Sequence, residues 1–293
     1  MKVSDSNQNN LLKILSLFSL VRGYNIIVLV LAQYLTARYI LDPKTPWHIL
    51  LLDLRFFAIV SASSLSTAAG YIINNFYDSA KDQINRPKKF MLEHLISQKH
   101  QLIVYLILNM LAFVIASVIS VWVVLFFLFY MLIIWLYSNT IKRLFWLSNV
   151  FSAILMILPF WAITLYFKNF ETIIFYHAVY LFFLILARDI IKDLESFVGD
   201  WVHRYKTLPV VFDHITAKAI ASLCILLTYV PNYLIIQQPF GSIHYFFWAS
   251  IPFLIFVLIF LWFAQTQKAY LWTHNFIKFW ILIGVFSISL VFR

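Results

Sequence analysis

The sequence predicts an all-α membrane protein built as a bundle of nine transmembrane helices, and three observations support this fold class. Hydrophobic residues make up 63% of the 293 residues, and charged residues only 12%. The mean hydropathy is +0.86, and 30 Phe, 16 Tyr and 10 Trp are more apolar material than one soluble core of this length could bury. Apolar stretches of membrane-spanning length recur along the whole chain. A water-soluble protein is therefore excluded.

Each apolar window of about 17–25 residues predicts one membrane-crossing helix. The third and fourth windows follow one another without a Gly or Pro over 36 residues, which is too long for one crossing and enough for two. We expect a single domain over residues 1–293, with residues 1–10 as a polar N-terminal tail of the mature protein. The predicted spans are Ile14–Leu35, Phe56–Phe76, Leu102–Val121, Val123–Tyr137, Val150–Phe167, Ile173–Ala187, Ala217–Ile236, Phe246–Ala264 and Phe276–Phe292.

The distribution of Lys and Arg between the two sets of loops predicts which side of the membrane each set faces. With nine spans, the loops on the side of the N-terminus collect seventeen Lys and Arg residues, whereas the opposite loops collect five. Cytoplasmic loops of membrane proteins carry an excess of Lys and Arg. We therefore expect a multi-pass protein of the cell inner membrane, with a cytoplasmic N-terminus and cytoplasmic loops after spans two, four, six and eight.

The charge and the cysteine content exclude several classes of function. A formal net charge of +10 would suit nucleic-acid binding only if the cations shared a soluble face, which this chain lacks. The single cysteine, Cys224, excludes a disulfide framework and a multi-cysteine metal site. The eight His residues show no zinc-binding spacing. Contact with anionic membrane lipid explains the cations better.

Acidic residues are concentrated in two of the predicted cytoplasmic loops, which contain eight of the twelve Asp and Glu residues. In the first loop Asn74, Asp78 and Asp82 are spaced four apart, so on a helix that continues past span two they line one side. Carboxylates four residues apart on a helix repel each other. A bound divalent cation would reverse that penalty.

The second acidic loop repeats this geometry after span six, where Asp189 and Asp193 are four residues apart. They follow Asn74 and Asp78 by the same 115 residues, which suggests two helix ends that present acids to a shared cavity. Either cluster alone is more typical of solvated loop charges. Together, and each followed by Lys and Arg residues, they favour a diphosphate held through Mg²⁺, which often binds one or two carboxylates plus substrate phosphates.

Small residues in span two lie on the same four-residue track as the first acid cluster. Ala62, Ser66 and Gly70 precede Asn74 at intervals of four. Small residues at this spacing let a neighbouring transmembrane helix approach closely. Span two is therefore expected inside the bundle rather than against lipid.

The two acidic loops resemble the paired motifs of the UbiA superfamily of intramembrane prenyltransferases, which transfer an isoprenoid chain from its diphosphate to an acceptor. The first family motif, Asn-Asp-x-x-Asp-x-x-x-Asp, is commonly followed by Asn-Arg-Pro. Asn75 stands in place of the first Asp, and a carboxamide is a weaker Mg²⁺ ligand than a carboxylate. The matching residues are Asn74, Asp78, Asp82, Asn85, Arg86 and Pro87.

The second family motif is similar to Lys-Asp-x-x-Asp-x-x-Gly-Asp followed by Lys-Thr-Leu-Pro. Ser196 occupies the place of an Asp, and Arg204 stands where many members have Gly, which predicts an altered turn. Weaker matches at Arg22 with Asn25 and around Lys142 extend the resemblance over residues 22 to 209. The residues that match the second motif are Lys192, Asp193, Gly199, Asp200, Lys206, Thr207, Leu208 and Pro209.

The resemblance implies a bundle of nine transmembrane helices around a central cavity that opens to the cytoplasm and laterally to lipid. It implies Mg²⁺-dependent transfer of a geranylgeranyl or longer polyprenyl group from its diphosphate to a membrane-associated acceptor. The sequence looks most like the branch that prenylates geranylgeranylglyceryl phosphate. An aromatic quinone precursor stays open as the acceptor, and so does the oligomeric state.

The resemblance also implies roles for individual residues. The Mg²⁺ ligands would be Asn74 together with the four catalytic carboxylates, Asp78, Asp82, Asp193 and Asp200. Departure of an allylic diphosphate would leave positive charge on the prenyl C1, which aromatic faces attract. The residues expected to bind substrate are Arg22, Asn25, Asn74, Tyr77, Arg86, Lys142, Lys192 and Lys206.

Two other classes of function stay open on the sequence alone. A transporter or channel would place ionisable residues near mid-span, whereas these acids lie at span ends; Pro159, Pro231 and Pro252 could kink three spans. Asn75 and Ser196 would suit a prenyltransferase-like scaffold that has lost activity. Metal-dependent transfer to a lipid distinguishes the enzyme from both.

Overall fold

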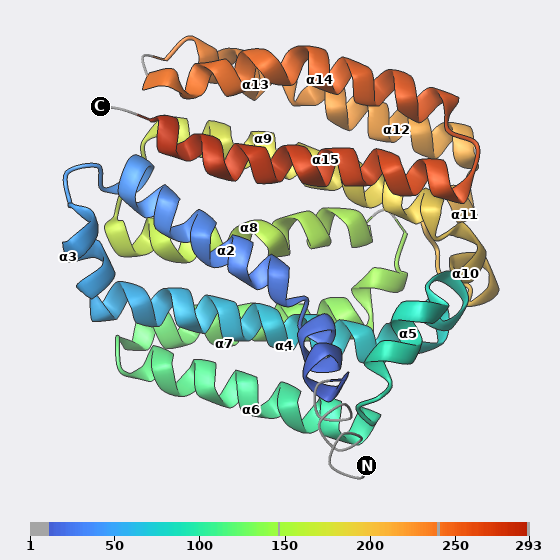
Figure 1. The fold of residues 1–293 in the computed structure, drawn as a ribbon, viewed down its shortest axis with the longest axis horizontal. Helices are drawn as coiled ribbons and strands as arrows, with labels where there is room; N and C mark the ends of the chain where they lie inside the picture. Colours follow the sequence, from blue (N-terminus) through green and yellow to red (C-terminus); the bar gives the residue numbers. More distant parts are fainter. Residues whose placement is uncertain (1–11, 146, 239–240, 292–293) are drawn as a thin grey trace, which may run out of the picture.

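The computed structural model describes residues 12–145, 147–238 and 241–291, and over these ranges the chain is helical without a β-strand (Figure 1). The predicted polar tail, residues 1–10, lies outside the described residues. The helices are α2 (Gly23–Thr36), α3 (Trp47–Leu52), α4 (Leu54–Asn85), α5 (Pro87–Glu93), α6 (Gln98–Ser117), α7 (Val121–Asn139), α8 (Leu147–Phe167), α9 (Thr172–Glu195), α10 (Phe197–Val202), α11 (Leu208–Val211), α12 (His214–Leu227), α13 (Tyr229–Ile236), α14 (His244–Phe263) and α15 (Gln267–Ser287).

Nine helical segments of the described chain are long and apolar enough to cross a membrane, which confirms the predicted number of spans. The long apolar stretch after residue 102 does divide into two helices. The first, α6, ends at Ser117, and the side chain of Ser120 caps α7 by accepting a hydrogen bond from the backbone N–H of Val123 (3.3 Å). The prediction placed this boundary slightly too late, because a serine cap is a weak signal within an apolar run.

The predicted first span, Ile14–Leu35, is wrong at both ends. Arg22 has a left-handed backbone (φ 49°), which separates a short helix at residues 12–20 from α2. The ring of Phe18 packs directly on Gly23, where a Cβ atom would lie only 2.1 Å from it, so only glycine fits at this bend. The spanning segment starts at Gly23, and a π-helical turn extends it to Leu41.

The predicted last span, Phe276–Phe292, begins too late. The spanning segment runs from Gln267 to Leu290, and Thr266 caps its first turn through the backbone N–H of Ala269 (3.2 Å). The hydropathy window misses the first two turns because they contain polar residues. Several of these polar residues face the interior of the bundle, where they matter for the site described below.

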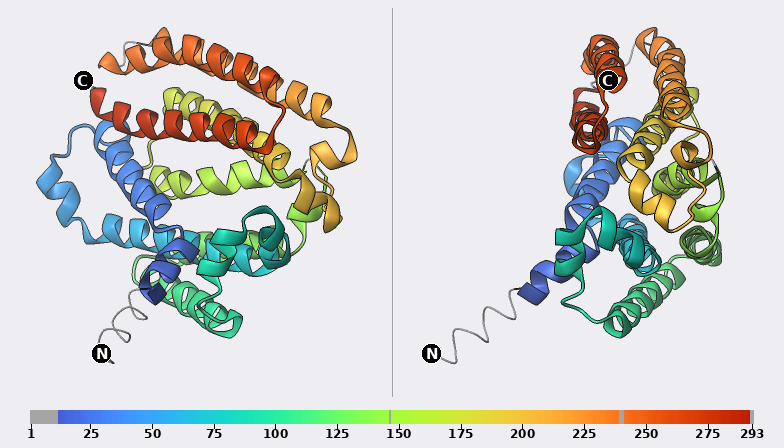
Figure 2. Two further views of the ribbon diagram at one scale, coloured as in Figure 1. Left: turned by 45° about the vertical axis from the view of Figure 1, so that its right-hand side comes forward. Right: turned by 90° about the vertical axis from the view of Figure 1, so that its right-hand side faces the viewer.

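Six helices form a closed ring in which each packs against the next, in the order α2, α4, α7, α8, α9, α15 and back to α2. The end-on view in Figure 2 shows this arrangement. Outside the ring, α6 packs against α4 and α7, while α12 and α13 pack against α9 and α14 packs against α15. The ring therefore brings together segments from both ends of the sequence.

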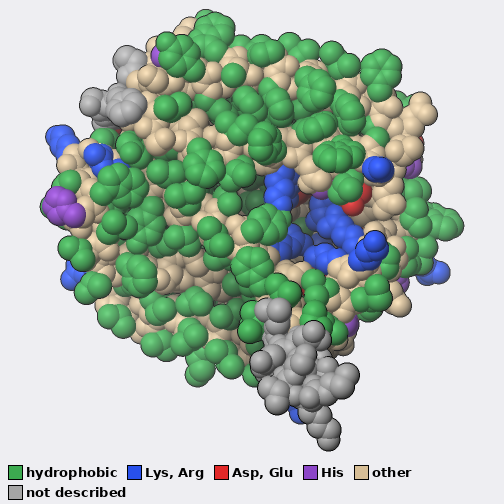
Figure 3. Space-filling model, in the orientation of Figure 1, with side chains coloured by type: hydrophobic (Ala, Val, Ile, Leu, Met, Phe, Trp, Pro, Cys, Tyr) green, Lys and Arg blue, Asp and Glu red, His purple; other side chains and the backbone are tan. Residues whose placement is uncertain are grey.

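The helix α4 is the most buried span of the described chain, which confirms that span two lies inside the bundle. Ala62 and Ser66 are fully buried, and a Cβ atom on Gly70 would lie 3.0 Å from Ile134 of α7. These small side chains permit the close approach of neighbouring helices. The outer surface is instead rich in large apolar side chains, as expected of a protein embedded in lipid (Figure 3).

Candidate active site

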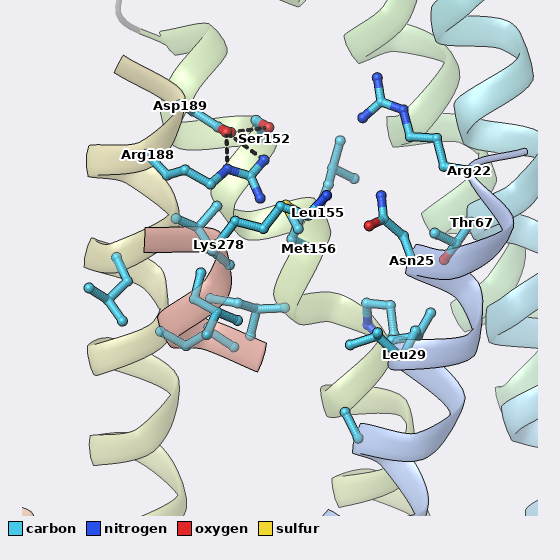
Figure 4. A pocket seen from close by; sticks show the side chains of 18 of the residues that line it. Arg22, Asn25, Leu29, Thr67, Ser152, Leu155, Met156, Arg188, Asp189 and Lys278 are labelled. Atoms are coloured by element: carbon cyan, nitrogen blue, oxygen red, sulfur yellow. Dashed lines mark hydrogen bonds and ion pairs between the residues drawn. The ribbon is translucent and has the colours of Figure 1, made fainter. Parts of the chain in front are cut away.

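The ring of six helices surrounds a cavity of about 1200 Å³. Figure 3 shows a hollow on one face of the molecule, with Lys and Arg side chains gathered around it on an otherwise largely apolar surface. Deeper in the cavity the walls are mainly apolar, with Leu29, Leu155 and Met156 among them (Figure 4). Among the described residues, the charged side chains that line it are Arg22, Asp78, Lys81, Arg86, Lys89, Lys142, Arg188, Asp189, Lys192, Asp193 and Lys278.

The first acid cluster lies near the end of α4. Because this helix continues unbroken to residue 85, Asn74 and Asp78 are one turn apart and both line the cavity. The Lys142 ammonium, from the turn after α7, lies 2.8 Å from Asp78 Oδ1 and donates a hydrogen bond to Asn74 Oδ1 (3.4 Å). The Tyr205 hydroxyl also donates to Asp78 Oδ1 (3.3 Å). Burial raises the pKa of Tyr205 to about 12, so this hydroxyl stays protonated and can donate.

The second acid cluster lies at the end of α9 and in α10. Asp193 lines the cavity, and the side-chain amide of Asn149 donates to its Oδ2 (2.8 Å). Asp200 is fully buried behind the cavity wall. Its Oδ1 lies 2.9 Å from the Lys81 ammonium of α4, and its Oδ2 accepts a hydrogen bond from the Ser196 hydroxyl (3.2 Å). An ion pair between α4 and α10 therefore joins the two acid-bearing walls.

The junction between α9 and α10 is clamped by Asn85 at the end of α4. The Asn85 side-chain amide donates to the carbonyl of Ser196 (3.1 Å), and its carbonyl accepts the backbone N–H of Gly199 (3.0 Å). A Cβ atom on Gly199 would lie 2.4 Å from the Asn85 amide nitrogen, so this close approach requires glycine. Asn85 and Gly199 thus position Asp200.

Arg204 adopts the left-handed backbone conformation (φ 56°) that glycine takes most readily. The expected alteration of this turn is therefore not seen: the arginine keeps a glycine-type conformation. The turn carries the chain from α10 to Tyr205 and Thr207, both of which line the cavity. The left-handed turn at Arg204 thus directs the chain after α10 so that Tyr205 and Thr207 reach the cavity.

Four of the residues selected from the sequence do not line the cavity. Asp82 is half-buried on α4, two turns beyond Asn74, and Lys206 is exposed. Tyr77 lies behind the wall, where the Lys142 ammonium sits 5.6 Å from its ring centre. Asp200 reaches the site only through Lys81. The helical drift of about 40° for each four-residue step explains why Asp82 turns away.

Four other predicted residues line the cavity from three sides: Arg22 and Asn25 from the start of α2, Arg86 from the end of α4, and Lys192 from α9. Arg22 lies 4.7 Å from the ring centre of Tyr71, and Asn25 donates a hydrogen bond to the Tyr71 hydroxyl (3.3 Å). Figure 4 shows Arg22 and Asn25 facing the ion pair of Arg188 and Asp189 across the cavity.

Arg86 is held in place by an acid from the opposite wall. Its Nη2 lies 2.7 Å from Glu195 Oε2, and His274 Nε2 of α15 lies 2.9 Å from the same oxygen. Glu195 is buried and does not line the cavity. This contact chain ties the end of α4, the end of α9 and the middle of α15 together around a cavity-lining arginine.

Sequence reasoning missed several residues that the fold brings to the site. Lys81 and Tyr205 contact the acids directly, while Lys278 and His274 come from α15. Lys81 lies within the first motif, between two of its acids, and its position in the motif is the one signal that could have marked it. The two α15 residues carry no local signal, because only tertiary packing brings this helix beside α2 and α9.

The two departures from the family motifs have different surroundings. Asn75 is buried and does not line the cavity, so its lack of charge removes no carboxylate from the cavity wall. Ser196 donates its hydroxyl hydrogen bond to Asp200, and an Asp at this position would bring a second negative charge beside Asp200. Neither departure changes Asp78 or Asp193, which face the cavity.

The donor chemistry of the site fits Mg²⁺ shared between protein and diphosphate. Asp78, Asp193 and the side-chain carbonyl of Asn74 place oxygen atoms of the kind that Mg²⁺ prefers on the cavity wall. Among the described residues, no group of three or more His, Cys, Asp or Glu side chains could hold a metal ion by itself. Mg²⁺ is commonly bound by one or two carboxylates plus substrate phosphates rather than by an all-protein cage. The abundant cations around these acids suit the remaining charge of a diphosphate.

The fold and the site define a membrane-embedded protein with a cavity that is acidic and basic at one end and apolar along its depth. The UbiA prenyltransferase family model matches residues 27–283. The chain therefore belongs to this family, whose members are prenyltransferases.

Individual relatives agree with this assignment. A digeranylgeranylglyceryl phosphate synthase of Methanosphaera stadtmanae is 28% identical over 193 residues, which cover 66% of this chain and 71% of that protein. A structure from work on digeranylgeranylglyceryl phosphate synthase in membranes superposes with a TM-score of 0.71 and 18% identity, covering 95% of this chain and 98% of that one. A UbiA homologue of Archaeoglobus fulgidus bound to GPP and Mg²⁺ gives 0.67 and 16%, covering 94% and 99%. The predicted fold class is confirmed.

Proposed function

We propose that this chain transfers a polyprenyl group, geranylgeranyl or longer, from its diphosphate to a membrane-associated acceptor in a Mg²⁺-dependent reaction. The observation that carries the proposal is that Asp78 of α4 and Asp193 of α9, one from each acid cluster, line the same cavity. The Archaeoglobus fulgidus homologue with GPP and Mg²⁺ supports the same chemistry. Bound Mg²⁺ would neutralise the diphosphate and make it a better leaving group.

In this proposal the protein binds the donor by its two chemically different parts. Asn74, Asp78 and Asp193 would hold the metal ion, and Arg86, Lys142 and Lys192 would contact the diphosphate oxygens. The isoprenoid chain would lie along the apolar walls deeper in the cavity, where burial of each CH₂ group contributes about 0.8 kcal/mol. This arrangement fixes the prenyl C1 close to the polar end.

The transfer breaks the C1–O bond, and the diphosphate leaves with the electron pair of that bond. A nucleophilic atom of the acceptor then bonds to C1 and loses its proton. Among the described residues, Asp189 is the cavity-lining carboxylate that donor binding does not require. It accepts hydrogen bonds from Ser152 (2.7 Å) and Arg188 (2.8 Å), which hold it in place for accepting that proton. The apolar walls deeper in the cavity would limit the access of bulk water to C1.

The basic residues at the entrance support a phosphate-bearing acceptor. Arg22, at the start of α2, and Lys278 of α15 both line the cavity, and Lys278 donates a hydrogen bond to the hydroxyl of Tyr24. Neither cation forms an ion pair with an acid of the described residues, so the two together would bind a second anionic group. Geranylgeranylglyceryl phosphate has such a group, and the relatives named digeranylgeranylglyceryl phosphate synthase support it. A carboxylated aromatic acceptor is the second candidate.

The proposal places the polar end of the cavity on the cytoplasmic side of the inner membrane. The excess of Lys and Arg on that side supports this orientation. Both substrates would then reach the site from the leaflet that faces the cytoplasm. The oligomeric state does not enter this proposal, because all the named residues come from one chain.

The test uses purified protein in detergent with geranylgeranyl diphosphate and each candidate acceptor, with and without Mg²⁺. We expect pyrophosphate release and a prenylated phospholipid product only with Mg²⁺ and geranylgeranylglyceryl phosphate. Asp78→Asn and Asp193→Asn should each lower turnover by about 100-fold or more, because each removes a charged metal ligand.

The control variant is Asp42→Asn, which makes the same chemical change in the loop between α2 and α3, at the other end of the helices (Figure 1). It should keep wild-type turnover. Prenylation of an aromatic acceptor alone would select the second candidate. Turnover that is unchanged in both acid variants would remove these carboxylates from the mechanism.

A further inference from the structure

Lys81 lies close to carboxylates of both acid clusters. Its ammonium lies 2.9 Å from Asp200 Oδ1, and the carboxylates of Asp78 and Asp193 are also within electrostatic range. The ring centre of Tyr205 lies 4.7 Å from the same nitrogen. The side chain is only 18% exposed, whereas that of Asp200 is completely buried. Lys81 is therefore a deeply placed cation and differs from an ordinary solvated loop lysine.

At this position a cation offsets the repulsion between the carboxylates of the two acid clusters. Asp78 and Lys81 are on α4, whereas Asp193 is on α9 and Asp200 is on α10, so without a cation the clusters would present like charges to one another. A buried carboxylate without a partner is strongly destabilising, and an ammonium or a metal ion can supply the missing charge. The side chain of Lys81 supplies it from within the protein.

The charge balance limits how many divalent ions can bind as well. Lys142 pairs with Asp78 and Lys81 pairs with Asp200 (2.8 and 2.9 Å), so two of the three carboxylates Asp78, Asp193 and Asp200 already have an ammonium partner. Among the described residues, Asp193 is the one of these three carboxylates that forms no ion pair, and its direct partner is the neutral side-chain amide of Asn149. Asp193 is therefore the carboxylate of this set that is not neutralised by an ammonium, and one such carboxylate together with diphosphate oxygens is a sufficient ligand set for one divalent ion.

We propose that Lys81 is a resident cation that takes the place of one divalent ion between the two acid clusters. This inference rests on the proposed function, because it concerns the same diphosphate site. It follows that the protein binds a diphosphate together with one divalent ion, and that Lys81 contributes the charge that a second ion would bring. Removal of the ammonium frees Asp200 and leaves room for a second ion.

The test counts bound Mn²⁺ on the full chain in detergent, with inorganic pyrophosphate present, by electron paramagnetic resonance of free Mn²⁺. We expect about one Mn²⁺ per wild-type chain and about two per chain of Lys81→Met, because the freed carboxylates regain their capacity for a metal ion. Lys81→Arg keeps the charge and should bind about one. Lys88→Met, which removes an exposed lysine of α5 outside the cavity, is the matched control and should also bind about one.

Equal Mn²⁺ counts in wild type and Lys81→Met would overturn the inference, and so would about two ions in the wild type, since the metal would then displace the ammonium. If Lys81→Met does not fold, Lys81→Gln, which keeps a polar side chain, carries the same expectation. The count does not depend on prenyl transfer. A failed transfer assay with a raised Mn²⁺ count would therefore reject the proposed function, whereas normal transfer with an unchanged count would reject only the role of Lys81.

Discussion

The two acid-bearing walls of the cavity are built differently, although their sequences show the same spacing of four residues. On the first wall, Asn74 and Asp78 belong to one unbroken helix of 32 residues, whose regular geometry fixes both side chains. On the second wall, the helix ends at Glu195, and Asp200 lies in a separate short helix. The first wall is thus positioned by secondary structure, and the second by tertiary contacts.

This difference predicts that the second wall is more sensitive to changes away from the acids themselves. Its position depends on Asn85, Ser196 and Gly199, which join α10 to α4. The first wall needs no comparable clamp, because each of its acids follows from the helix that carries it. Substitutions at these clamp residues should therefore disturb the second wall and leave the first wall unchanged.

The largest effect in this comparison is expected for Asn85→Ala. It removes both hydrogen bonds between α4 and the junction of α9 and α10, which are worth about 2 kcal/mol together. If Asp200 shifts and the same free energy is lost from the stabilisation of the transition state, turnover should drop by about 30-fold. Steady-state pyrophosphate release measures the effect, and the melting temperature should fall as well.

Asn109→Ala is the matched control, because the Asn109 amide donates its hydrogen bond to the carbonyl of Tyr105 within its own helix, α6. It should leave turnover unchanged. Normal turnover of Asn85→Ala would mean that the second wall holds its shape without the clamp, and the contrast drawn between the walls would be wrong.

A smaller effect is expected for Glu195→Gln, which acts on the donor through Arg86. The carboxylate of Glu195 holds Arg86 at 2.7 Å and His274 at 2.9 Å, and the neutral amide would weaken the contact with the guanidinium. We expect the KM for the prenyl diphosphate to rise about tenfold, which corresponds to the loss of one charge-assisted hydrogen bond, with little change in kcat.

Kinetics with donor and acceptor varied separately measure this effect. If Glu195 acts only by positioning Arg86, the KM for the acceptor stays constant in Glu195→Gln. An equal rise in both KM values would instead indicate general loosening of the site, and no change would show that Arg86 does not need Glu195.

The parts of the fold that depend on local signals could be predicted from the sequence. Apolar length alone identified all nine spans of the described chain, and helical periodicity placed Asn74 and Asp78 on one side. The bend at Arg22 was missed, because its left-handed backbone is set by the packing of Phe18 on Gly23. The four-residue spacing also predicted that Asp82 lies on the same helix face as Asn74 and Asp78, whereas Asp82 does not line the cavity.

The unpredicted part of the site depends on contacts between segments far apart in the chain. Lys81 and Asp200 are 119 positions apart, and Glu195 and His274 are 79 apart. Hydropathy and spacing describe one segment at a time, so neither can show which lysine meets which acid. The packing of α15 against α2 and α9 likewise has no local signature.

The central claim is that the two acid clusters act on one ligand, and a double-mutant cycle on Asp78 and Asp193 tests it most directly. The affinity for a non-reactive thiolo analogue of geranylgeranyl diphosphate in Mg²⁺ would be measured by calorimetry for wild type, Asp78→Asn, Asp193→Asn and the double variant. The account predicts that each single change weakens binding by about tenfold or more, and that the double variant is weakened far less than the product of the two, because residues that share a ligand are coupled. Losses that multiply independently, or binding that survives either change, would contradict it.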